Sequence, residues 1–365
     1  MEFDIQPDPR ANERGIHLPR GLREEMGILL GQFLQLRGRE ELILEVRKNL
    51  DPNQEYALVS HSNFSKIRGQ DVEFKIMEVT LGCDPEFFII WRNTLISATT
   101  YLPFAGQIGA DGSLGELRPM YAKHEDQVVE NLSRLIPQIP HQMKRSSWAK
   151  GFPEGGESFE YLAHSYFRGL PAGFHVHLGI PPEILNTRKD FSRAAMNHLV
   201  KCLDWYVSVP LVPLEENHFR RLGHSHYGRP GDYRPSNITL EYRTPGAFYL
   251  RSPAMARGLL GLCLLLTENV VSRIKVTSSN FVNLHRLSES ELQEVMPIPE
   301  PNKIKNVLQD RDVKVAKSHL EKIRRELQEL PTYGKHEQAV EEFFREVEAG
   351  KAPLPNLLHN WKGST

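Results

Sequence analysis

Residues 81–89 read Leu-Gly-Cys-Asp-Pro-Glu-Phe-Phe-Ile, and this stretch decides the fold class. Its apolar residues are typical of a β-strand, on which side chains two positions apart point to the same face. Asp84 and Glu86 therefore share one face, while the apolar neighbours meet a core. A single pair of this kind is also what a half-solvated surface strand looks like, so the pair alone does not define a site.

Three further strand-like stretches carry an ionisable pair at the same spacing. They are Glu116 with Arg118, His175 with His177, and Glu241 with Arg243. A solvated face would be rich in Lys, Ser and Thr, whereas these pairs hold only carboxylates, imidazoles and guanidinium groups. Two imidazoles on one face suit a divalent metal or phosphate, and carboxylates hold Mg²⁺ while substrate phosphates complete its shell. Arginines neutralise the charge that develops in phosphoryl transfer. Together the pairs predict a cavity of acidic and imidazole ligands rimmed by arginine.

A cation-rich segment precedes the last of these strands. It contains His218, Arg220, Arg221, His224, His226, Arg229 and Arg234. Such a segment is either a solvated basic loop or an anion clamp, and both interpretations stay open. Arg229 and Arg234 are the better candidates for an anion contact, because nearby glycines permit close approach. The usual glycine-rich nucleotide motifs are missing, so a bound nucleotide would depend on a sheet-borne metal site.

Composition limits the class of protein. The chain has 365 residues, of which 40% are apolar and 25% charged, enough for one large or two medium domains with a real core. Lys and Arg number 45 against 46 Asp and Glu, which gives no argument for nucleic acid or a membrane as partner. The three cysteines predict neither a disulfide framework nor a zinc knuckle, and the N-terminus lacks a secretory signal pattern. We expect an intracellular protein.

Helical patterns flank the strands. An N-terminal stripe of Leu22, Met26, Leu29, Leu30, Phe33 and Leu36 predicts a helix, and helices are also expected at 124–136, 190–206, 252–276, 313–330 and 339–350. The pattern thus divides the chain into a mostly helical N-terminal extension (1–74), a strand-bearing core (75–276) and a helical C-terminal region (277–365).

The order of the motifs resembles that of the glutamine synthetase-like carboxylate–amine ligases, and most closely their phage-type amidoligase branch, the type 2 carboxylate–amine ligase family. The resemblance rests on residues 82–88, on Asp111-Gly112 with 116–119, on 173–179 and on 240–245. It covers roughly 75–275, which would be the ligase core. One departure from the wider superfamily is Asp84, where Glu is usual.

The resemblance implies an α+β fold, with an antiparallel sheet curled into a funnel and helices on its outer face. It implies an ATP-dependent enzyme that joins a carboxylate to an amine, giving an amide or isopeptide bond through an acyl phosphate. Carried over residue by residue, the ligands of Mg²⁺ or Mn²⁺ would be Asp84, Glu86, Glu116, His175 and Glu241. Phosphate and substrate carboxylate would be bound by four arginines, Arg118, Arg229, Arg234 and Arg243. His177 would lie behind the metal ligands and help to bind the nucleotide. Substrates would be a small-molecule or peptide carboxylate and an amine, and the location cytoplasmic, in the host if the chain is phage-encoded.

Two other functions remain open from the sequence. A zinc hydrolase would explain the histidines and carboxylates, but it leaves four arginines without a role. A catalytically inactive structural relative of the ligases is the other alternative, against which the intact ligand set argues. The sequence names neither substrate and gives no oligomeric state.

Overall fold

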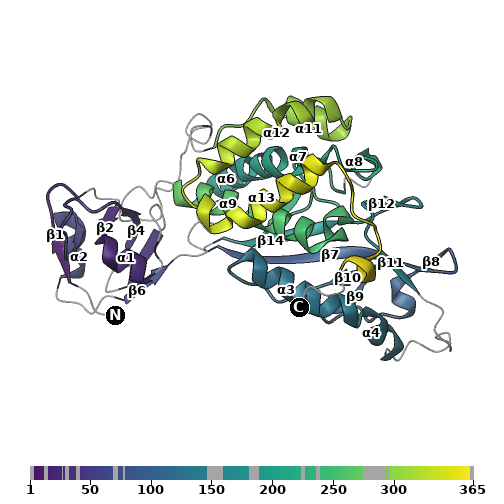
Figure 1. Cartoon of the computed structure of the whole chain (residues 1–365). Coiled ribbons are helices and arrows are strands. Elements are labelled where there is room, and N and C mark those ends of the chain that lie inside the picture. The colour runs from purple at the N-terminus through teal and green to yellow at the C-terminus, as the bar shows by residue number, and fades with distance from the viewer. Residues whose placement is uncertain are drawn as a thin grey trace.

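The computed structural model describes residues 4–11, 15–26, 28, 33–37, 42–68, 73–76, 79–145, 159–180, 189–222, 227–235, 239–273, 293 and 296–361. Within these residues the chain forms a six-stranded N-terminal sheet, followed by a larger sheet covered by helices (Figure 1).

The N-terminal sheet has the strand order β1-β5-β2-β4-β3-β6 and mixes parallel with antiparallel pairs. Its strands are β1 (Ile5–Pro7), β2 (Gly15–His17), β3 (Phe33–Arg37), β4 (Leu42–Arg47), β5 (Ala57–Val59) and β6 (Glu73–Ile76), and its helices are α1 (Arg20–Met26) and α2 (His61–Ile67). It has an apolar core of its own, which includes Ile16, Leu34 and Val59.

The prediction of a mostly helical N-terminal extension is wrong. The expected helix along the stripe from 22 to 36 ends at Met26, and the chain forms β3 from Phe33 onward. Gly31 interrupts the stripe and lowers helix propensity, and a short apolar run fits a strand as well as a helix. Leu34 is fully buried in the sheet, so tertiary burial decided between the two.

The second sheet has the order β15-β16-β14-β7-β10-β9, with β8 and β11 also paired to β7, and every pair is antiparallel. Its strands are β7 (Thr80–Trp91), β8 (Thr94–Ile96), β9 (Ile108–Asp111), β10 (Leu114–Leu117), β11 (Glu160–Leu162), β14 (Phe174–Gly179), β15 (Tyr233–Pro235) and β16 (Leu240–Tyr242); β12 (Tyr166–Phe167) and β13 (Leu170–Pro171) form a separate pair. The first half of β7 pairs with β14 and the second half with β11 and β8, which makes β7 the spine of the sheet. The expected α+β class with an antiparallel sheet is therefore present.

Helices cover one face of this sheet. They are α3 (Glu125–Leu135), α4 (Ile139–Arg145), α6 (Lys189–Leu203), α7 (Val209–Leu211), α8 (Phe219–Leu222), α9 (Pro253–Arg273), α11 (Pro301–Gln309), α12 (Val313–Gln328), α13 (Tyr333–Ala349) and α14 (Leu357–Asn360), with short 3₁₀ turns η1 (Ala98–Thr100), η2 (Ile136–Gln138) and η4 (Ala247–Arg251) and a π-helical turn η3 (Asp204–Ser208). The helices expected around 124–136, 190–206, 252–276, 313–330 and 339–350 are confirmed. The C-terminal helices share one apolar core with the sheet, so their packing is continuous with it.

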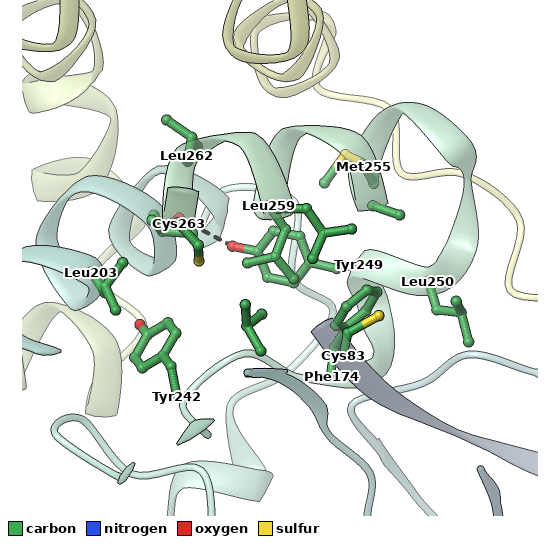
Figure 2. Close-up of a cluster of buried hydrophobic side chains, with 14 of the residues drawn as sticks. Cys83, Phe174, Leu203, Tyr242, Tyr249, Leu250, Met255, Leu259, Leu262 and Cys263 are labelled. Carbon is green, nitrogen blue, oxygen red and sulfur yellow. Dashed lines mark hydrogen bonds between the residues drawn. The ribbon is translucent and has the colours of Figure 1, made fainter. Parts of the chain in front are cut away.

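The core lies between α9 and the sheet. Cys83 on β7 and Phe174 on β14 lie beneath Met255 and Leu259 of α9, and Tyr242 on β16 points toward Leu203 and Cys263 (Figure 2). α13 packs in turn on α9, on the side away from the sheet (Figure 1). Among the described residues α9 is the one helix long and apolar enough to cross a membrane, but 83% of that apolar window is buried inside the protein.

Because β-strand side chains alternate, the residues between these core positions face the other way. Near the end of β7 this second face is closed by a small apolar cluster that includes Phe88, Ile90 and Leu114. Along the first half of β7 this same face of the sheet carries the ionisable pairs.

Candidate active site

The strand register aligns the ionisable residues in one row. Directly opposite one another stand Asp84 and His175, Glu86 and Glu116, His177 and Glu241, and Glu241 and Arg234. Side chains directly opposite on neighbouring strands share a face and lie close together. The row therefore runs across β15, β16, β14, β7 and β10.

Asp84 and two histidines form the centre of the row. His177 Nε2 lies 3.0 Å and His175 Nδ1 3.5 Å from Asp84 Oδ1, and His175 Nδ1 lies 3.7 Å from Glu241 Oε1. Asp84, His177 and Glu241 each offer one potential ligand atom within 4.8 Å of the others. Burial alone would raise the pKa of Asp84, but hydrogen bonds from the two histidines bring it down to about 2.

Two further carboxylates of the row, Glu86 and Glu116, are buried. Burial raises the pKa of Glu86, and burial together with the charge of Asp84 raises that of Glu116 to about 7, although Glu116 is ion-paired with Arg118. The pKa of His177 is raised by its contact with Asp84, which outweighs the opposing effect of burial. The site thus concentrates negative charge that its arginines only partly neutralise.

Glu86 is held in place by two donors. The Tyr227 hydroxyl donates to Oε1 at 2.7 Å, and the backbone N–H of Gly173 donates to Oε2 at 2.5 Å. Tyr227 is not among the residues predicted from the sequence, although it lies in the same glycine-rich segment as Arg229 and Arg234. Its ring lies edge-on to His175, with a 5.3 Å centroid distance, and lies 4.9 Å from the guanidinium carbons of both Arg220 and Arg243. Tyr227 therefore links the acidic row to two cations.

The predicted arginines take different places. Arg234 Nε donates to Glu241 Oε2 at 2.5 Å, while 64% of the Arg234 side chain stays exposed at the rim. Arg243 lies one residue beyond β16, and its Nε is 3.3 Å from Glu241 Oε1. From its sequence this stretch is expected to be a strand over 237–248, but β16 ends at Tyr242, and Pro245 cannot donate to a ladder. Arg229 is half-buried, with its carbonyl accepting from Thr244 Oγ1 at 3.0 Å, and its anion contact stays a prediction.

The remaining cations of the segment support the loop. Arg220 is buried and donates to the carbonyls of Arg243 at 2.8 Å and Thr244 at 2.7 Å. Arg221 forms a buried, two-pronged ion pair with Glu215 at 2.5 Å. Arg220 and Arg221 therefore make buried structural contacts and are not solvated. His224 and His226 lie outside the described residues.

Asp204 holds the loop around Gly231 against the neighbouring strand β16. It lies in the π-helical turn η3, a feature common near functional sites, and accepts from the Tyr242 hydroxyl at 2.7 Å and the Gly231 N–H at 2.6 Å. Burial raises the pKa of Asp204 to about 6. At the other end of the loop Gly228 has φ +72°, and a Cβ there would lie 1.8 Å from Arg220 Nη1, so only glycine fits.

The donor set fits a hard divalent cation. Within the described part of the chain, Glu241 Oε1 and Glu116 Oε2 are buried carboxylate oxygens that lie in ion pairs with Arg243 and Arg118 but accept no well-aligned hydrogen bond. Several carboxylates buried in one place are costly even beside arginines, and a divalent cation coordinated by them would offset that cost. Asp84, Glu86, Glu116, His175 and Glu241 are the predicted side chains available for such coordination, and His177 joins them because its ligand atom lies with those of Asp84 and Glu241.

The chain belongs to a family of carboxylate–amine ligases. Residues 81–353 match the family described as phage phiEco32-like COOH.NH2 ligase-type 2, which covers the whole row and the helices behind it. The match continues past 276, through the C-terminal helices that share the core. No curated protein matches the chain.

Three solved structures are distantly similar. They are a bifunctional glutathione synthetase from Pasteurella multocida (12% identity, TM-score 0.34, 74% of this chain and 52% of that one), the ligase PafA in complex with the prokaryotic ubiquitin-like protein Pup (11%, 0.37, 74% and 66%) and a novel glutamine synthase homolog (10%, 0.33, 91% and 80%). The chain thus spans about half the length of the glutathione synthetase.

Proposed function

We propose that this protein is an ATP-dependent ligase that forms an amide or isopeptide bond through an acyl-phosphate intermediate. The observation that carries the proposal is the single row of carboxylates and histidines across four strands, with an arginine at each end. Membership of the family supports the general class, a ligase that joins a carboxylate to an amine. The row supplies the groups that ATP and Mg²⁺ or Mn²⁺ would need.

The carboxylates and histidines of the row would hold the divalent ions. Bound there, the ions would neutralise the phosphate oxygens of ATP and stabilise charge during phosphoryl transfer. Glu86, Glu241 and His175 are almost fully buried, whereas Arg234 and Arg118 are partly exposed, so the ligands lie deeper than the arginines. This gradient supports cation binding at the base of the site and anion binding at its exposed rim.

The proposed reaction has two steps. An oxygen of the substrate carboxylate attacks the γ-phosphorus of ATP and ADP leaves, which gives the acyl phosphate. The amine nitrogen then attacks the acyl carbon, the C–O bond to phosphate breaks, and the nitrogen loses a proton. Arg118, Arg234 and Arg243 would orient the phosphate and carboxylate and offset their charge; no protein nucleophile is needed.

A substrate screen tests the proposal. Purified protein with Mg·ATP is offered panels of carboxylates and amines, including peptides, and ADP release is measured with and without each partner. We expect ADP release that depends on both substrates and on Mg²⁺ or Mn²⁺, with mass spectrometry showing a product lighter than the two substrates by one water. Hydrolysis of an amide without ATP, in protein that retains tightly bound zinc, would instead support the hydrolase alternative.

A further inference from the structure

A second cluster of metal-ligating side chains lies where α3, α9 and α13 meet. His124 is the N-cap of α3, Glu125 is its first residue, and His336 lies in the first turn of α13. α9 supplies Glu268 and packs against both other helices. These residues belong to helices behind the sheet and not to the row on its polar face.

Both imidazoles present the same nitrogen to one carboxylate oxygen. Glu125 Oε2 lies 2.9 Å from His336 Nδ1 and 3.6 Å from His124 Nδ1, and the two rings are stacked with centroids 5.7 Å apart. Zinc bonds of about 2.0–2.1 Å in a tetrahedral site separate ligand atoms by roughly 3.3 Å, which falls between these two distances. His124, Glu125 and His336 each offer an atom within 4.8 Å of the others.

The outer ring nitrogens are also fixed. His336 Nε2 lies 3.2 Å from Glu268 Oε2, and His124 Nε2 lies 3.3 Å from the backbone carbonyl of Lys335. Glu268 is itself held by Lys335 Nζ at 2.5 Å. Histidines that bind metals almost always donate their other N–H to a carboxylate or a carbonyl in this way.

A proton on His336 is the competing explanation, because a protonated imidazole between Glu125 and Glu268 would make the same two contacts. His124 distinguishes the two. Its Nδ1 accepts from the Asp126 N–H at 3.3 Å, so Nδ1 carries a lone pair and Nε2 carries the hydrogen. The same Nδ1 lies 3.6 Å from Glu125 Oε2, a second acceptor with no hydrogen between them, so a cation bound there would replace the long N-cap hydrogen bond and contact both atoms.

We propose that His124, Glu125 and His336 form a second divalent-metal site, of the zinc type, that ties α3 to α13. His336 and Glu125 are almost completely buried, while the His124 side chain is 32% exposed. The site is therefore closed on the His336 side and open beside His124, where a water would complete the shell. Nitrogen and carboxylate ligands at this spacing favour Zn²⁺ over Mg²⁺. The site would stabilise the helical layer and take no part in ligation.

The test uses full-length protein stripped with a chelator and then held in millimolar Mg²⁺ to occupy the ligase site. Zn²⁺ is titrated by calorimetry, and thermal unfolding is followed with and without one equivalent of Zn²⁺. His124→Gln removes the partly exposed ligand together with the N-cap and the ring contact with His336, so its melting temperature with Zn²⁺ is compared with that of the same variant without Zn²⁺; His141→Gln, an exposed histidine on α4, is the control. A His177→Gln variant reports any zinc that enters the ligase site.

We expect wild type, His141→Gln and His177→Gln to bind one Zn²⁺ at micromolar or lower concentration and to melt at a higher temperature with it. His124→Gln should lose that binding and that rise. Glu268→Gln keeps all three ligands but should bind about 10–100-fold more weakly, because it alters the support of His336. Equal zinc stoichiometry and equal thermal shift in His124→Gln and wild type would overturn the proposal, as would binding seen only at millimolar zinc.

Discussion

Removing one oxygen, in Tyr227→Phe, should weaken divalent-metal binding while leaving the sheet intact. The Tyr227 hydroxyl donates to Glu86 Oε1 at 2.7 Å, and its ring packs between His175 and two guanidinium groups. Phenylalanine keeps the ring and removes only the donor. The change therefore isolates the hydrogen bond that orients Glu86.

The magnitude follows from the kind of bond that is lost. A hydrogen bond to a charged group contributes about 1.5–3 kcal/mol, and each 1.4 kcal/mol is tenfold in affinity. Glu86 keeps the Gly173 N–H, so the loss should not exceed that range. We expect Tyr227→Phe to bind Mn²⁺ about 10–100-fold more weakly, which is also the usual cost of altering a residue behind a metal ligand.

The assay is Mn²⁺ binding to chelator-stripped protein, followed by the loss of the free-ion electron paramagnetic resonance signal. Tyr233→Phe is the matched control, because its hydroxyl donates to Asn197 Oδ1 at 2.7 Å on the edge strand β15. The control should bind Mn²⁺ like wild type. Wild-type affinity in Tyr227→Phe would refute the reasoning, and an equal loss in both variants would point to general disturbance of the sheet.

Three further predictions concern rate, pH and packing. Arg243→Lys keeps the charge but loses the planar fork, so it should bind Mg·ATP nearly as wild type yet turn over on the order of 10²-fold more slowly; near wild-type ADP release would make the ion pair with Glu241 purely structural. Burial raises the pKa of Asp204 to about 6, against about 3.9 in the unfolded chain, so the fold favours the protonated form and stability rises as pH falls from 6 toward 4. Asp204→Asn should lose that part of the pH dependence, on the order of 2 kcal/mol in urea unfolding, and an unchanged slope would contradict the assignment. Gly115→Ala should lower the free energy of unfolding by about 1–3 kcal/mol, because a Cβ there would lie 2.3 Å from the buried Phe87 ring, whereas Gly334→Ala meets open space and should change it by less than about 0.5 kcal/mol; equal values for both would refute the packing argument.

The sequence predicted the polar face of the sheet because strand periodicity is a local property. Asp84 and Glu86, or His175 and His177, point the same way whenever their segment is extended, whatever surrounds it. Which strands are neighbours is a non-local property. The pairing of His175 with Asp84, and of Glu116 with Glu86, therefore came from the structure.

The errors arose where local signals were ambiguous. The stripe ending at Leu36 satisfied both a helix and a strand, and only burial of Leu34 in the N-terminal sheet separated them. Tyr227 was missed because a tyrosine in a glycine-rich loop has no signature of its own. Its role depends on Glu86, which is 141 residues away in the sequence. Arg220 likewise looked like its neighbours until the structure showed it buried against two carbonyls.

Calorimetry of ATP binding, with Mg²⁺ and then in EDTA, tests whether the row of carboxylates and histidines is a metal-dependent nucleotide site. We predict that wild type binds ATP with Mg²⁺ and loses measurable binding in EDTA. Glu241→Gln, which removes the charge of a buried carboxylate of the row, should bind poorly in both conditions while unfolding cooperatively. ATP affinity that is equal with Mg²⁺ and in EDTA, or equal in wild type and Glu241→Gln, would contradict the assignment of this face as the active site.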